Sequence, residues 1–219
     1  MERLGLLFIF QNQADSFMST SEKTDGNPEG LPDSDLVETY IDGETVYQGS
    51  FFNVEKDRVR LPHGGLATRE YIRHPGAVVI LPLFGDGRVL LERQFRFPAN
   101  GIFLEFPAGK IDRGEDILVA AQRELKEETG YTASTWHYLT TIHNALGYSD
   151  ERLIIYLAKD LHEGKAELDE EEFVQTFKTS VSQLLEWVEN GTITDAKTVI
   201  GSFWLEKIAN NQWDLEKVV

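Results

Sequence analysis

The stretch EFPAGKIDRGEDILVAAQRELKEETGY, residues 105–131, contains the clearest helix signal in the chain. Leu118, Ala121 and Leu125 recur with helical spacing and mark a stripe that packs on a core. Gly130 follows as the glycine that often ends a helix in a left-handed conformation. The stretch therefore predicts a helix with one buried face.

Another side of this helix concentrates negative charge. Glu124, Glu127 and Glu128 share an arc of roughly 100°, given 3.6 residues per turn. Like charges at this spacing destabilise a helix by a few tenths of a kcal/mol, and they also oppose the macrodipole near its C-terminal end. A divalent cation would offset this repulsion, since Mg²⁺ prefers hard oxygen ligands and phosphate oxygens. The alternative is an ordinary solvated acidic face.

The turn before the helix adds a candidate ligand. Gly109 follows Pro107 and Ala108 directly after a predicted strand. Because glycine lets the backbone come close to a ligand, the carbonyl oxygen of Ala108 could contribute to a metal site. A plain tight turn is the alternative interpretation.

Composition limits the class of protein. The chain has 219 residues and a formal net charge of −16, with 41% hydrophobic and 26% charged residues, a globular balance. The acidic excess argues against a nucleic-acid partner, which requires clusters of Lys and Arg. The absence of cysteine excludes disulfides, zinc-thiolate sites and thiol nucleophiles. It is compatible with a reducing cytoplasm, and we expect a cytoplasmic protein.

The N-terminal segment is expected to contain neither a membrane span nor an export signal. No apolar run reaches the roughly 18 residues that a membrane span needs, so we expect no membrane partner. The start MERLGLLFIFQNQ lacks a small-residue cleavage site, and we expect no signal peptide. Met18 is an alternative translation start.

The chain is predicted to have three parts: a flexible extension over residues 1–35, a strand region over 36–70 and a main domain over 71–219. In the strand region, Asp42-Gly43 separates two alternating runs and predicts a hairpin turn. A second turn is predicted at Gly85-Asp86-Gly87, between two apolar runs.

Strands precede and follow the first helix, and two further helices end the chain. This order predicts an α+β protein, with an α/β/α sandwich built on a mixed sheet. Asp195 is the expected N-cap of the last helix. The strands are expected at residues 102–106, 134–144, 151–161 and 171–179, and the helices at 180–190 and 195–209.

The spacing over residues 109–131 resembles the box of the Nudix hydrolases. The matching positions are Gly109, Glu115, Arg123-Glu124-Leu125, Glu127-Glu128 and Gly130-Tyr131, without a departure. The segments ERQFRFP, GYSDE and GTITDAKTVIGSFWL look more specifically like the ADP-ribose pyrophosphatase branch. The resemblance covers about residues 70–210 and implies a Nudix-type sandwich.

This resemblance implies hydrolysis of a nucleoside diphosphate linked to another group, with Mg²⁺ or Mn²⁺ as cofactor. It implies Glu124 and Glu128 as the principal metal ligands, together with the carbonyl of Ala108. Glu127 is implied as a further ligand, directly or through water. Arg123 is implied to pair with a neighbouring carboxylate and to hold the geometry of the cluster.

Other residues acquire roles from the same resemblance. A glutamate in the loop ELDEEEFVQTF would position the attacking water, with Glu172 as the first choice and Glu171 as the second. Arg96 resembles the arginine that binds the diphosphate, which suits a guanidinium fork. Glu151 resembles a position that contacts the ribose or a metal.

The adenine of such a substrate needs an aromatic surface. Phe51 and Phe52, with Tyr40 and Tyr47, are candidates in the strand region, although core packing is the default for each. In the resembled branch this region crosses to a second subunit, so a homodimer is expected. His74 is expected to be structural.

The resemblance favours a pyrophosphatase that converts ADP-ribose to AMP and ribose 5-phosphate. A GDP-mannose or UDP-sugar pyrophosphatase is the first alternative, because the box reads the diphosphate and not the base. A non-catalytic, nucleotide-sensing regulator with the same fold is the second. Turnover of a panel of nucleotide sugars with added Mg²⁺ would distinguish all three.

Overall fold

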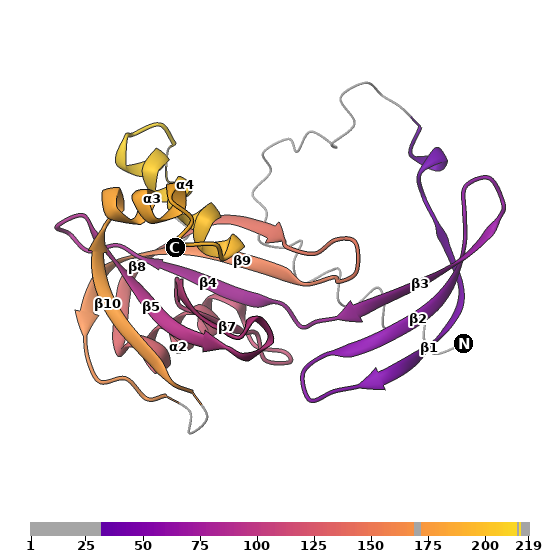
Figure 1. Ribbon diagram of the computed structural model, residues 1–219, viewed down its shortest axis with the longest axis horizontal. Helices are drawn as coiled ribbons and strands as arrows, with labels where there is room; N and C mark the ends of the chain where they lie inside the picture. Colours follow the sequence, from indigo (N-terminus) through magenta and orange to yellow (C-terminus); the bar gives the residue numbers. More distant parts are fainter. Residues whose placement is uncertain (1–31, 169–171, 214, 216–219) are drawn as a thin grey trace. The chain divides into compact units, whose positions relative to one another are not determined.

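The computed structural model describes residues 32–168, 172–213 and 215 (Figure 1). Within this part the chain forms two compact units. One comprises the residues up to Ile41 with Arg58–Ala67, and the other comprises Asp42–Asp57 with the chain from Thr68 onward. Of the expected N-terminal extension, residues 1–31, including the alternative start at Met18, lie outside the described residues. Its last three residues, Asp33–Asp35, form the short 3-10 helix η2.

The strand region forms a three-stranded sheet in the order β1-β2-β3, with β1 at Thr39–Gln48, β2 at Asn53–Arg60 and β3 at Leu66–Arg73. The hairpin prediction at Asp42-Gly43 is wrong, because β1 continues through both residues. A Cβ on Gly43 would lie 1.8 Å from Oδ1 of Asp57, so this glycine permits a close approach within the sheet instead of a turn. The chain reverses later, where the N–H of Gly49 donates to the carbonyl of Phe52.

The main domain contains two further sheets. One has the order β7-β4-β9-β8, and in it β4 and β9 are parallel while the other pairs are antiparallel. The other has the order β10-β5-β6 and is antiparallel throughout. The strands are β4 Ala77–Pro82, β5 Arg88–Arg96, β6 Gly101–Glu105, β7 Ala108–Lys110, β8 Tyr131–His143, β9 Arg152–Glu163 and β10 Val174–Ser180.

The predicted turn at Gly85-Asp86-Gly87 is confirmed. Gly87 has a φ of 82°, and the N–H of Phe84 donates to the carbonyl of Arg88. The two strands that this turn joins, β4 and β5, nevertheless enter different sheets. At this turn the chain passes from the sheet β7-β4-β9-β8 to the sheet β10-β5-β6, which holds Arg96.

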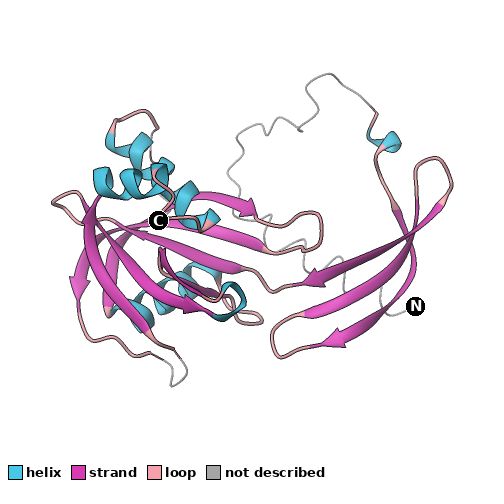
Figure 2. Cartoon of the chain, viewed as in Figure 1, coloured by secondary structure: helices cyan, strands magenta, loops and turns pink. Residues whose placement is uncertain are grey.

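The helices lie on both sides of the strands (Figure 2), with α2 on one side and α3 and α4 on the other. Asp116 and Asp195 cap α2 and α4 through their carboxylates, and Gly130 ends α2 with a φ of 76°. The N-cap at Asp195 and the glycine end at Gly130 are as predicted. The bounds are α2 Ile117–Thr129, α3 Val181–Glu189 and α4 Ala196–Ala209, and the 3-10 helix η3 covers Phe97–Ala99.

Strand β4 shows why the fold has three layers. Val78 and Ile80 pack in the core beneath α2, whereas Val79 and Leu81 pack in the core beneath α3 and α4. Successive residues of a strand point to opposite faces, so one apolar strand serves both cores. The predicted α+β class and α/β/α arrangement are therefore confirmed. No helix in the described part of the chain is long and apolar enough to cross a membrane.

Candidate active site

The acidic face of α2 lies against β7. A Cβ on Gly109 would lie only 1.9 Å from Cδ of Glu124, so the Glu124 carboxylate occupies the space that any other residue at 109 would fill. One turn further along α2, the Glu128 carboxylate accepts the backbone N–H of Ala108 at 3.1 Å. Both carboxylates are mostly buried, with Glu124 9% and Glu128 4% exposed. The sequence stretch Ala108-Gly109 thus positions two predicted metal ligands.

Arg123 ties the surrounding carboxylates together, as its implied role requires. Its Nη1 donates to Glu124 at 2.8 Å and to Glu127 at 3.0 Å. Its Nε donates to Glu115 at 2.9 Å, and its Nη2 donates to the carbonyl of Lys110 at 3.1 Å. The hydrogen bond from Arg123 to Glu115 lowers the pKa of Glu115 below its usual value. Because one planar guanidinium serves three carboxylates, their relative positions are fixed.

A second group of carboxylates comes from the antiparallel sheet. Glu92 of β5 is fully buried, and neither of its carboxylate oxygens has a hydrogen-bond partner among the described residues. Burial, and then the charge of Glu105 opposite it in β6, raises the pKa of Glu92 to about 8. Burial and the charges of Glu92 and Glu124 raise the pKa of Glu128 well above its usual value. The site therefore concentrates negative charge that the protein only partly neutralises.

This donor set fits a divalent cation. Carboxylate and carbonyl oxygens are the ligands that Mg²⁺ prefers, and buried like charges can ionise together only beside a compensating positive charge. Arg123 already holds Glu124 and Glu127. Among the described residues, no group of three or more Asp, Glu or His side chains is arranged so that it could hold a metal ion without rearrangement. A cation would have to share these carboxylates with Arg123.

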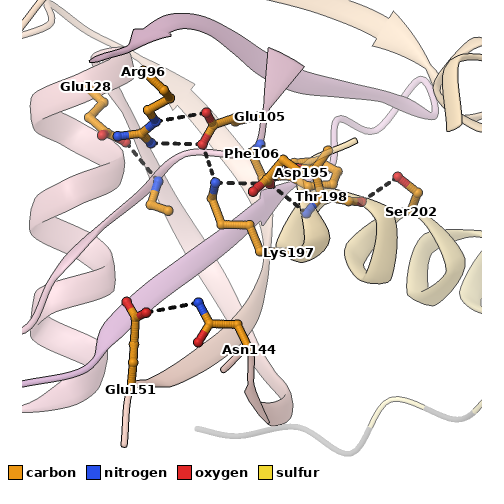
Figure 3. Close-up of polar contacts among 11 residues, drawn as sticks. Arg96, Glu105, Phe106, Glu128, Asn144, Glu151, Asp195, Lys197, Thr198 and Ser202 are labelled. Carbon is orange, nitrogen blue, oxygen red and sulfur yellow. Dashed lines mark hydrogen bonds and ion pairs between the residues drawn. The ribbon is translucent and has the colours of Figure 1, made fainter. Parts of the chain in front are cut away.

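Arg96 ends β5 beside this cluster (Figure 3). Its Nε and Nη2 donate to the two carboxylate oxygens of Glu105 at 2.9 and 2.8 Å, a bidentate pair. The Arg96 side chain is 40% exposed, whereas that of Glu105 is 3% exposed. Sequence reasoning missed Glu92 and Glu105. The available signal was a glutamate at the end of an apolar strand run, as in VLLE and IFLE.

Two of the four candidate base-binding aromatics, Phe51 and Phe52, line a cavity of about 340 Å³, whereas Tyr40 and Tyr47 do not line it. Phe51 and Phe52 contact each other edge to face, with ring centroids 5.0 Å apart, and Phe51 contacts the His74 ring at 5.7 Å. Glu151 accepts the side-chain amide of Asn144 at 2.9 Å, as Figure 3 also shows. The cavity wall comprises Phe51, Phe52, Ile72, His74, Asn144, Ala145, Tyr148, Ser149 and Glu151. The structure thus brings three predicted substrate residues together.

The predicted water-positioning residues are only partly described. Glu171 lies outside the described residues. Glu172 precedes β10 and is half-buried, and its charge contributes to the raised pKa of Glu124 and of Glu128. Glu172 therefore lies within electrostatic range of the α2 carboxylates.

The unpartnered carboxylate of Glu92 predicts a pH-dependent stability. Its pKa is about 4.5 in an unfolded chain and about 8 in the fold, so the folded state holds the proton more tightly. The free energy of unfolding therefore falls as pH rises from about 4.5 to about 8. Replacing Glu92 with glutamine removes this contribution. Relative to the unsubstituted protein, we expect Glu92→Gln to gain about 2–5 kcal/mol between pH 5 and pH 8.5 without metal.

Urea unfolding in EDTA across this pH range measures the difference. The exposed Glu163 at the end of β9 provides the control Glu163→Gln. Glu92→Gln and the unsubstituted protein can differ in stability by any absolute amount. If that difference stays constant with pH, Glu92 does not have a raised pKa in the fold.

Comparison with known proteins relates this geometry to a family. The NUDIX domain model matches residues 73–199, and the nucleoside diphosphate sugar hydrolase N-terminal domain model matches residues 38–72. The ADP-ribose pyrophosphatase of Bacillus subtilis is 37% identical over 78% of this chain and 94% of that protein. The methanol dehydrogenase activator of Bacillus methanolicus is 36% identical over 77% of this chain and 92% of that protein. A crystal structure of an ADP compounds hydrolase matches with a TM-score of 0.71 and 27% identity, over 80% of this chain and 95% of that chain.

Proposed function

We propose a reaction for this chain on the basis of an established fact: the chain belongs to the Nudix hydrolase family, as the match of the NUDIX domain model over residues 73–199 shows. The chain hydrolyses the diphosphate of ADP-ribose and yields AMP and ribose 5-phosphate. One observation supports this proposal most strongly: the chain is 37% identical to an ADP-ribose pyrophosphatase over 94% of that protein. The buried acidic site on α2, β5 and β6 supports it, because a diphosphate needs a cation beside it to enter such a site.

Mg²⁺ is the proposed cofactor, with Mn²⁺ as the alternative. Glu124, Glu128 and the carbonyl of Ala108 would hold it, with Glu127 contributing directly or through water. When bound, the ion neutralises charge on the diphosphate as the phosphorus is attacked. The mutual repulsion of the buried carboxylates supports this assignment.

The protein's own residues provide orientation. Arg96 would bind the diphosphate through the N–H groups that Glu105 leaves free. Glu172 would orient the attacking water, with Glu171 as the second choice. Arg123 keeps Glu124 and Glu127 in place through hydrogen bonds of 2.8 and 3.0 Å.

The cavity at Phe51 and Phe52 would receive the nucleoside. Aromatic side chains offer a stacking surface to a base, and the carboxylate of Glu151 can accept a ribose hydroxyl. The cavity volume of about 340 Å³ suits the nucleoside part of such a ligand. His74, expected from sequence to be structural, lines the same cavity.

We also propose the organisation that the sequence predicts: an extension over residues 1–35, a base-binding and dimerisation region over 36–70 and a hydrolase domain over 71–219. A homodimer is supported by apolar side chains that β1 leaves exposed, among them Tyr40 at 57%, Val46 at 51% and Tyr47 at 54%. A cytoplasmic location stays a prediction.

A substrate panel tests the proposed function. We expect kcat/KM for ADP-ribose to exceed that for GDP-mannose and for UDP-glucose by about 10- to 100-fold, the range that contacts to one part of a ligand supply. Mass spectrometry should identify AMP and ribose 5-phosphate as products. A preference for GDP-mannose or UDP-glucose would establish the alternative pyrophosphatase instead. No turnover of any compound with Mg²⁺ or Mn²⁺ would favour the nucleotide-sensing regulator.

A further inference from the structure

A row of charged side chains connects Arg96 to the start of α4 (Figure 3). Lys197, in the first turn of α4, donates through Nζ to a carboxylate oxygen of Glu105 and, at 3.0 Å, to Asp195. Glu105 uses the same carboxylate to accept both hydrogen bonds from Arg96. Lys197 is only 8% exposed. Its ammonium group therefore bonds to Glu105 and Asp195 instead of to solvent.

Further hydrogen bonds hold the end of this row, at Asp195, in place. Asp195 accepts the backbone N–H of Thr198 at 3.0 Å and its hydroxyl at 2.7 Å. The Thr198 hydroxyl in turn accepts the backbone N–H of Phe106 at 3.0 Å, and Phe106 directly follows Glu105 in the chain. Thr198 and Phe106 are both fully buried. Two independent connections therefore fix the end of β6 to the start of α4.

Glu105 restricts what Arg96 can do. A guanidinium has five N–H donors, and Glu105 takes one from Nε and one from Nη2, which leaves three for a ligand. The charges of Glu92 and Glu128 also act on Arg96. Without its bond to Glu105, Arg96 would be free to turn toward those carboxylates and neutralise them. Glu105 thus keeps the guanidinium available for a substrate.

Lys197 stabilises the ionised form of the buried Glu105 carboxylate. Burial opposes the ionisation of Glu105, but the hydrogen bond from Arg96 and the charge of Lys197 outweigh it and lower the pKa of Glu105. Glu92 stands opposite Glu105 in the adjacent strand and repels it. Removing Lys197 would leave Arg96 as the immediate counter-charge for two buried glutamates.

We propose that Lys197 is a positioning residue for the diphosphate site: it fixes the carboxylate of Glu105, and Glu105 sets the guanidinium of Arg96 toward the substrate. Lys197 does not itself touch the substrate. The inference rests on the proposed function, from which the role of Arg96 comes. It adds a link between the last helix and the reacting diphosphate.

Kinetics of variants at position 197 test the proposal. Lys197→Met removes the charge, and Lys197→Arg retains it; Lys207→Met, in the last turn of the same helix, is the matched control. We expect KM for ADP-ribose to rise about tenfold or more in Lys197→Met, the size of one charged hydrogen bond, with a smaller change in kcat. Lys197→Arg should recover most of the loss, and Lys207→Met should match the unsubstituted protein.

A double substitution separates positioning from general stability. In an Arg96→Gln background, Lys197→Met should change KM by less than about twofold, because contacting residues that act through each other are non-additive. The same rise in both backgrounds would overturn the proposal. Should Lys197→Met fail to fold, Lys197→Gln replaces it: it removes the charge but its amide can still donate to Glu105, so we expect a smaller rise in KM, again absent in the Arg96→Gln background, and an equal rise in both backgrounds would overturn the proposal.

Hydrogen exchange at Arg96 provides a readout that needs no activity. The Nε–H signal of Arg96 in NMR, identified by its loss in Arg96→Lys, should exchange about tenfold faster in Lys197→Met, as its acceptor loosens. Unchanged exchange would overturn the proposal even if ADP-ribose is the substrate. Faster exchange in a protein that does not hydrolyse ADP-ribose would uphold the Lys197–Glu105–Arg96 link and reject the proposed function alone.

Discussion

Replacing Glu128 with glutamine is expected to lower kcat for ADP-ribose by about 10³-fold or more while the fold stays intact. A metal ion contributes several kcal/mol of transition-state stabilisation, and each 1.4 kcal/mol corresponds to a factor of about ten in rate. The glutamine amide keeps the shape of the side chain. In the unsubstituted protein the Glu128 carboxylate accepts the N–H of Ala108 at 3.1 Å, and the amide oxygen of glutamine can still accept this hydrogen bond. What it loses is the negative charge that would hold the cation.

The same substitution should not destabilise the metal-free protein. Glu128 is 4% exposed, and burial together with the charges of Glu92 and Glu124 raises its pKa. Near neutral pH the folded state therefore gains nothing from the charge at this position, and a neutral side chain relieves the repulsion. The melting temperature in EDTA is expected to be equal to or higher than that of the unsubstituted protein.

Steady-state rates across a Mg²⁺ titration, with metal affinity from calorimetry, check both expectations. Glu189→Gln at the exposed end of α3 is the control for a lost surface charge. A Glu128→Gln rate within tenfold of the unsubstituted protein at saturating Mg²⁺ would refute the metal assignment. A large loss of melting temperature in EDTA would instead show that the carboxylate has a structural role.

The sequence predicted α2 well because its signals are local. The apolar stripe, the acidic face and Gly130 all lie within a few turns of one another, and the observed helix, Ile117–Thr129, contains the entire predicted face. The glycine before the helix was also recognised, although its contact with Glu124 was not. Spacing along one helix is sufficient to predict which of its residues share a face.

Residues that meet only through tertiary structure were missed. Glu105 and Lys197 are 92 positions apart in the chain, and Glu92 faces Glu105 because of the strand register between β5 and β6. Neither the register nor the packing of α4 follows from local pattern. The hairpin error at Asp42-Gly43 has the same origin, since an Asp-Gly pair is a turn signal unless a neighbouring strand needs the space that glycine leaves.

Gly109→Ala is expected to reduce kcat/KM for ADP-ribose by about 100-fold, with only a small change in stability. The new Cβ would lie 1.9 Å from Cδ and about as close to both oxygens of the Glu124 carboxylate. That carboxylate is the end of a flexible side chain, so it will move by an ångström or so while the backbone stays in place. Gly109 does not have a positive φ, so alanine itself introduces no backbone strain. A displacement of about 1 Å at a reacting centre can cost a factor of about 10² in rate.

The displaced carboxylate should also leave its 2.8 Å hydrogen bond with Arg123, so weaker binding of Mg²⁺ is expected alongside the slower reaction. Calorimetric titration with Mg²⁺ and thermal unfolding separate the two effects. Gly85→Ala is the matched control, because a Cβ there meets no atom within 4 Å and the φ of Gly85 is not positive. Normal activity and normal Mg²⁺ affinity in Gly109→Ala would mean that the Glu124 carboxylate does not need to lie against β7 for the reaction, and the proposed metal position would then be wrong.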